Sequence, residues 1–121
     1  MTPETREILT NAGMEVDSAL ERFMGSDAML ERFLQKFRKD PSYSSLVAAV
    51  AEEKLEDAFH AAHTLKGVAA NFSFEALRSI VSDQTEEFRA GRLEAGIALM
   101  PKVTEEYERV CVGLARLYGE E

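Results

Sequence analysis

The chain has 121 residues, of which 45% are hydrophobic, and this is enough for one buried core without disulfides or structural metals. Its net charge of -8 argues against nucleic acid as a partner, because binding to a phosphate backbone depends on clustered Lys and Arg. No apolar run is long enough to span a membrane and no secretory signal is visible, so we expect a cytoplasmic protein whose partners are proteins.

Apolar residues recur with a period near 3.6 along almost the whole chain, which predicts an all-α fold. At the N-terminus, Thr2 and Pro3 have the residue types of an N-cap and of a first helical position, and Gly13 is placed to end the short helix that they begin. A second brief helix is expected over about residues 15–24. Residues 25–27, Gly-Ser-Asp, then break the pattern.

Two further helices are expected before the middle of the chain. The first buries one face, formed by Leu30, Phe33, Leu34 and Phe37. Asp40 and Pro41 stop this helix and start the next, which Asp40 caps. A charged bend at residues 52–54 then precedes a longer helix.

The long helix is expected over about residues 55–71. Its apolar stripe consists of Leu55, Ala58, Phe59, Ala62, Leu65, Ala69 and Phe72. Ser73 is predicted to be the N-cap of the following helix, which Gly91 ends.

The last apolar pattern begins at Leu93 and contains Pro101, which predicts a kink or break near Met100. Cys111 lies in this pattern and is expected to be a buried thiol. Short connections favour antiparallel neighbours, so we expect an up-and-down antiparallel four-helix bundle with additional short N-terminal helices. The chain is then a single domain over residues 1–121, with cap helices over about 1–24 and the bundle over about 26–118.

The chemistry is concentrated around His63, which lies about 110° from the centre of the apolar stripe and is therefore expected to reach solvent. Lys66, Gly67 and Ala70 lie on the same side of the helix. The ordinary pKa of an imidazole is about 6.5, so a neutral ring with a free lone pair is available near pH 7. Lys66 can stabilise phosphoryl oxygens one turn away, and Gly67 and Ala70 leave the surface low enough for a partner to approach.

The string His63-Thr64-Leu65-Lys66-Gly67, preceded by two alanines and followed by Ala-Ala-Asn, resembles the core motif of histidine-phosphotransfer (HPt) domains of multistep phosphorelays. The similarity covers roughly residues 13–117. Family members often have glycine where this chain has Ser73, Gly-Asp at residues 53–54, and Leu-Glu at residues 84–85.

The resemblance implies that His63 is phosphorylated, that Lys66 assists and that Gly67 keeps the site accessible. The phosphoryl group would come from and go to aspartates of response-regulator receiver domains, including those of hybrid histidine kinases. Magnesium would be bound by the partner receiver, so no cofactor is expected on this chain. No nucleotide-binding motif is present, so we expect a phosphoryl carrier and not an ATP-dependent kinase. We also expect this carrier to be a monomer.

Other interpretations remain open. The chain is alternatively a helical adaptor that binds a receiver or kinase without being phosphorylated, or a metal-binding bundle that uses His60, His63 and Glu56. His60 and Phe74 are predicted to border the docking surface with Ala70. The starting methionine and the complete last helix favour a freestanding protein over a piece of a hybrid kinase.

Overall fold

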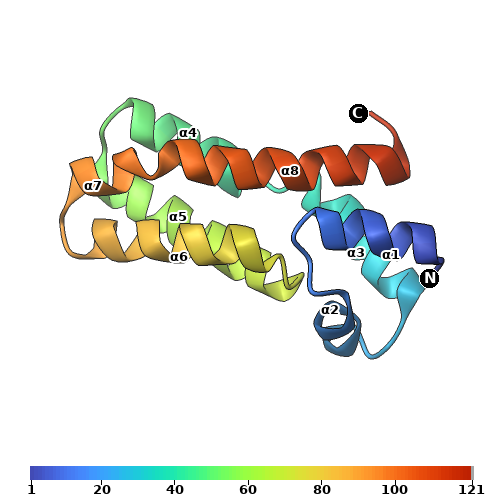
Figure 1. Ribbon diagram of the computed structural model, residues 1–121. Helices are drawn as coiled ribbons and strands as arrows, with labels where there is room; N and C mark the ends of the chain where they lie inside the picture. Colours follow the sequence, from blue (N-terminus) through green and yellow to red (C-terminus); the bar gives the residue numbers. More distant parts are fainter. Residues whose placement is uncertain (121) are drawn as a thin grey trace.

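The computed structural model describes residues 1–120, which form helices joined by short turns (Figure 1). In chain order these are α1 (Pro3–Asn11), α2 (Val16–Arg22), α3 (Asp27–Phe37), α4 (Ser42–Ala51), α5 (Leu55–Asn71), α6 (Glu75–Arg89), α7 (Leu93–Ala98) and α8 (Met100–Tyr118). Apart from one isolated bridge, these residues form no β-structure, so the predicted all-α class is confirmed.

Local sequence signals correctly predict the caps of α1 and α3 but not the exact bounds of α2. The side chain of Thr2 accepts a hydrogen bond from the backbone N–H of Thr5 and so caps α1, and Gly13, with a φ of +95°, turns the chain away after that helix. Ser26 caps α3 in the same way through the N–H of Met29. Helix α2 is shorter at both ends than the predicted segment.

Two later signals differ in outcome. The Asp40 carboxylate accepts a hydrogen bond from the Ser42 N–H at 2.9 Å, but the N-cap of α4 is Pro41 and not Asp40 as predicted. Pro101 lies in the first turn of α8, after the chain has broken at Leu99. A proline is tolerated at that place because the missing N–H has no partner in the first helical turn.

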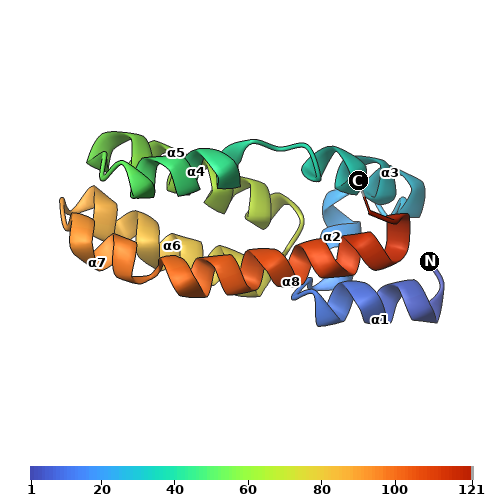
Figure 2. The same cartoon turned by 90° about the horizontal axis from the view of Figure 1, so that it is seen from above.

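The helices are arranged as an antiparallel bundle extended at one end. Helices α3 and α4 follow one another along one edge (Figure 2), and α5, α6 and α8 supply the other long rods. The α5–α6 pair is closed by a tight turn, α7 carries the chain from α6 to α8, and α1 packs against α8. This arrangement leaves one side of α5 open to solvent and confirms the predicted bundle with added N-terminal helices.

Ser73 is not the N-cap that its residue type predicts. It adopts a φ of +51°, and its hydroxyl donates to the Ser18 hydroxyl at 2.9 Å instead of capping α6. Glu53, in the bend before α5, has a φ of +55°. Both positions are in the left-handed region, which glycine adopts at no steric cost.

Cys111 is exposed and not buried as predicted. The face of α8 that enters the core carries Val103, Val110 and Leu114, and Cys111 lies beside that face. It adjoins the phenol of Tyr107, whose pKa is raised first by burial and then by this thiol. No helix within residues 1–120 is both long and apolar enough to cross a membrane.

Gly96 is the glycine most constrained by packing. A Cβ at this position would clash with the ring of Phe88, and Phe88 is itself buried. We therefore expect Gly96→Ala to lower the free energy of unfolding by about 1–3 kcal/mol, since the added methyl group overpacks the core and must displace this ring. Chemical denaturation measures this loss, and an unchanged midpoint would contradict the packing around Phe88.

Candidate functional site

Helix α5 holds the candidate site at the border between its buried and exposed faces. Ala58, Ala62, Leu65 and Ala69 are buried in the bundle. His63 lies outside this stripe and is exposed, as the helical period predicts. Within residues 1–120 no group donates a hydrogen bond to its imidazole or accepts one from it, so a ring nitrogen is open to an incoming reactant.

Lys66 lies one turn after His63 and is half-buried. Its ammonium forms no ion pair with any carboxylate in the described part of the chain. Many other cations of this acidic protein are paired; Lys54, for example, lies 3.3 Å from Glu52. The Lys66 charge is therefore available to an anionic group placed beside His63.

Gly67 is exposed, and a Cβ built at this position would meet no atom within 4 Å. Its φ is not in the left-handed region, so the backbone does not require glycine either. Glycine inside a helix costs about 1 kcal/mol relative to alanine. Neither packing nor backbone conformation within the described residues accounts for this cost.

Phe59 contacts the imidazole from one turn earlier in α5. The ring centroids of Phe59 and His63 are 5.9 Å apart and the ring planes are inclined by 18°. The prediction that Phe59 belongs to the core is only partly correct, because the side chain is half-buried. The i, i+4 spacing of the two rings was visible in the sequence and is the signal that would have identified this pair.

His60 and Ala70 lie on either side of these residues along α5. The His60 side chain is 66% exposed, and its Nε2 atom lies 3.8 Å from a carboxylate oxygen of Glu56. Ala70 is half-buried. Within residues 1–120 no three His, Cys, Asp or Glu side chains are placed to hold a metal ion together, so the geometry does not favour the alternative of a metal-binding bundle.

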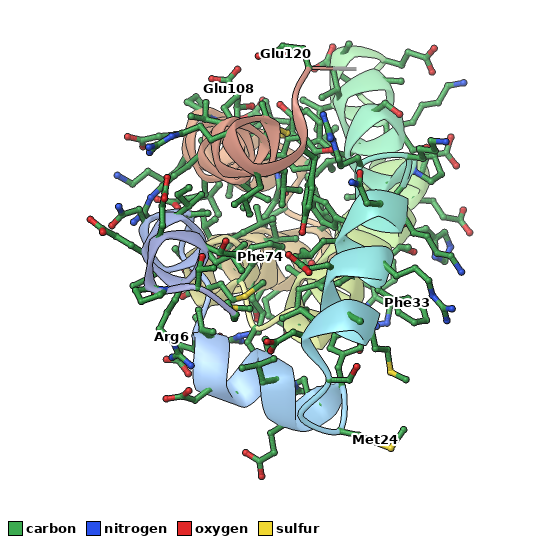
Figure 3. All side chains as sticks on the ribbon, turned by 90° about the vertical axis from the view of Figure 1, so that its right-hand side faces the viewer. Arg6, Met24, Phe33, Phe74, Glu108 and Glu120 are labelled. Carbon is green, nitrogen blue, oxygen red and sulfur yellow. The ribbon has the colours of Figure 1, made fainter. Side chains whose placement is uncertain are left out.

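Phe74 does not border the site, which corrects the prediction made from its position at a helix start. Its side chain is 0% exposed and lies in the interior, whereas Met24 projects from the edge of the molecule (Figure 3). Backbone hydrogen bonds join Glu15 N to Ser73 O and Glu75 N to Gly13 O. These hydrogen bonds hold the α5–α6 turn against the N-terminal segment. The Phe74 ring packs against the ring of Phe37, and the ring centroids are 5.5 Å apart.

An open groove between α4 and α5 lies beside His60. Small and acidic side chains line it, among them Ser45, Ala48, Asp57 and Thr64. The Thr64 hydroxyl donates to the carbonyl of His60 at 2.9 Å and therefore stays close to the helix. The groove therefore adjoins the α5 face that carries His60, and His63 itself is not part of its lining.

Comparison with known proteins identifies one family. The model described as the Hpt domain matches residues 28–113, which is well over half of the chain and includes all of α4 to α7. No curated protein and no solved structure matches the chain.

Proposed function

This chain belongs to the Hpt domain family, whose members carry phosphoryl groups on histidine in two-component systems, and we propose that His63 is the residue that carries it here. The observation on which the proposal rests is the state of the imidazole: it is exposed and has no hydrogen-bond partner within residues 1–120. Lys66 and Gly67 lie about one turn after His63 on the same side of α5. The Lys66 ammonium has no ion-pair partner within residues 1–120, and the space that a Cβ on Gly67 would enter is empty within 4 Å.

The donor in this proposal is an aspartyl phosphate on a receiver domain. The lone pair of one neutral imidazole nitrogen attacks phosphorus, a nitrogen–phosphorus bond forms, and the bond from phosphorus to the aspartate oxygen breaks. The carboxylate leaves with the electron pair, and the other ring nitrogen keeps its proton. The net charge is conserved, because a neutral ring and a dianionic acyl phosphate become an N-phosphoimidazole that keeps its N–H proton, with a net charge of about −1 on that group, and a carboxylate of charge −1. The reverse sequence delivers the group to a second receiver.

Partners and reaction type follow from the same reasoning. Receiver and kinase domains of two-component systems are the partners of this family. We expect the chain to take its phosphoryl group from such a partner and not from ATP, with magnesium bound by the receiver. We also propose that the chain acts as a cytoplasmic monomer and that neither nucleic acid nor a membrane is its partner.

The test is transfer from a phosphorylated receiver domain that carries a radioactive phosphoryl group. The wild-type chain should become labelled, and the label should be labile in acid and stable in base, as a phosphoramidate is. An adaptor that acts only by binding would remain unlabelled. A label that is labile in base as well, as an acyl phosphate is, would contradict a histidine acceptor.

Lys66→Ala should lower the rate of transfer about tenfold, because a charge-assisted contact to the phosphoryl oxygens contributes on the order of 1.4 kcal/mol at a half-exposed position. Lys66→Arg keeps the charge and should retain most of the rate. Rapid-quench measurement of label transfer compares them. Lys54→Ala is the matched control, an exposed lysine in the same region that is already paired with Glu52. Equal losses in the Lys66 and Lys54 variants would contradict a local role for Lys66.

A further inference from the structure

The orientation of the His63 ring depends on a contact that the motif does not include. An exposed side chain without hydrogen bonds ordinarily populates several rotamers. In this chain the imidazole lies against Phe59, with a centroid distance of 5.9 Å and an interplanar angle of 18°. These values correspond to two nearly parallel rings with a lateral offset, a favourable arrangement for an aromatic pair.

Phe59 is itself held from the neighbouring helix. The guanidinium carbon of Arg89, on α6, lies 5.0 Å from the centroid of the Phe59 ring, within the range of a cation–π interaction. The Nε atom of Arg89 also donates to a carboxylate oxygen of Glu86 at 3.1 Å. Phe59 is half-buried, so its ring lies at the border between α5 and α6, where it contacts both Arg89 and His63.

We infer that Phe59 is a positioning residue for His63, an inference that rests on the proposed function of His63 as phosphoacceptor. The stacked ring restricts the imidazole to one orientation and keeps a nitrogen directed at the incoming phosphorus. Histidine nucleophiles and bases are commonly oriented by a hydrogen bond to the second ring nitrogen. Here a ring contact performs that task and leaves both nitrogens without a protein partner within residues 1–120.

The expected effect is modest because the contact selects an orientation and does not touch the phosphoryl group. If the His63 side chain can also adopt its other staggered rotamers, the transfer rate should fall about three- to tenfold. Phe59→Leu removes the ring and keeps an apolar side chain, whereas Phe59→Tyr keeps the ring. The leucine variant should therefore lose rate, and the tyrosine variant should transfer like the wild type.

A spectroscopic measurement separates orientation from general damage. In the unphosphorylated wild type, the carbon-bound imidazole protons of His63 should show an NMR shift caused by the Phe59 ring and nuclear Overhauser contacts to its protons. In Phe59→Leu the shift should move toward the value of a free histidine, and in Phe59→Tyr it should remain. Tyr107→Leu is the matched control, because it removes a half-buried ring that stacks on Tyr43 at 3.8 Å on helices without proposed site residues.

Each outcome decides the inference. A Phe59→Leu variant with unchanged rate or unchanged His63 shifts would overturn it, as would an equal rate loss in Tyr107→Leu. If Phe59→Leu does not fold, the absence of Overhauser contacts between the two rings in the wild type would overturn it. A wild-type chain that accepts no label contradicts the proposed function instead, and the ring contact can still be measured there.

Discussion

The His63→Gln variant is expected to accept no phosphoryl group from a receiver that fully labels the wild type. Glutamine has a similar reach, but its amide nitrogen lone pair is delocalised into the carbonyl and cannot attack phosphorus. His63 is exposed and makes no hydrogen bond within residues 1–120, so the free energy of unfolding should change by less than about 0.5 kcal/mol. Label transfer and thermal unfolding, measured on the same preparation, separate loss of chemistry from loss of fold.

His60→Gln is the matched control for this variant. His60 lies one turn before His63, its side chain is 66% exposed, and its one ion-pair partner in the described chain is Glu56. This variant should still become fully labelled, because His60 is predicted to border the docking surface and not to accept the phosphoryl group. Persistent labelling of His63→Gln, or loss of labelling in His60→Gln, would contradict the assignment of His63.

The His63→Gln variant also distinguishes a carrier from an adaptor. An adaptor that regulates a receiver or kinase by occupying its surface would keep its effect when His63 becomes glutamine, because the shape of the exposed face is retained. A carrier would lose its effect in a reconstituted relay while still binding the receiver. Binding and relay output should therefore be measured side by side.

The second large effect is expected at Gly67, where function and stability should change in opposite directions. Gly67→Gln should reduce the transfer rate at least about a hundredfold, since a side chain next to the imidazole displaces the partner from the distance that phosphoryl transfer requires. The same substitution should raise the free energy of unfolding by up to about 1 kcal/mol, because glutamine is a better helix former than glycine. The space that a Cβ would enter is empty within 4 Å, so the chain itself offers no clash.

The size of the added side chain provides an internal series for this prediction. Gly67→Ala should give a smaller rate loss with a similar gain in stability. Val112→Gln is the control, because Val112 is a 62% exposed helical position on α8, away from the proposed site residues, and should transfer normally. A Gly67→Gln variant that transfers at the wild-type rate, or that unfolds more easily than the wild type, would show that this glycine is not retained for access.

Much of the fold could be predicted because its signals are local. The bounds of α5 and the break at Leu99, just before Pro101, depend on residues within a turn or two of each other, and the exposure of His63 follows from its angle to the apolar stripe. The site residues on α5 share one helix, so their spacing was sufficient to place them together. Two of the predictions that failed concern positions where the chain meets a distant segment.

Phe74 and Ser73 illustrate that limit. Their conformation depends on backbone pairing with residues 13–15, which are about sixty positions away and carry no sequence signal for that contact. Ser73 has the residue type of an N-cap, but the pairing holds it at a positive φ, and the same pairing carries Phe74 into the core. The contact from Arg89 to Phe59 likewise depends on how α6 packs against α5, which helical periodicity alone does not specify.

The most direct measurement is the site of the phosphoryl group on the labelled wild-type chain. Cleavage after Lys54 and Lys66 yields residues 55–66, a peptide that contains both histidines of the chain together with Glu56 and Asp57. Fragmentation by electron transfer at neutral pH should place the added mass on His63. Finding it on His60, or on a carboxylate of the same peptide, would contradict the conclusion that this exposed imidazole, which makes no hydrogen bond within residues 1–120, is the phosphoacceptor.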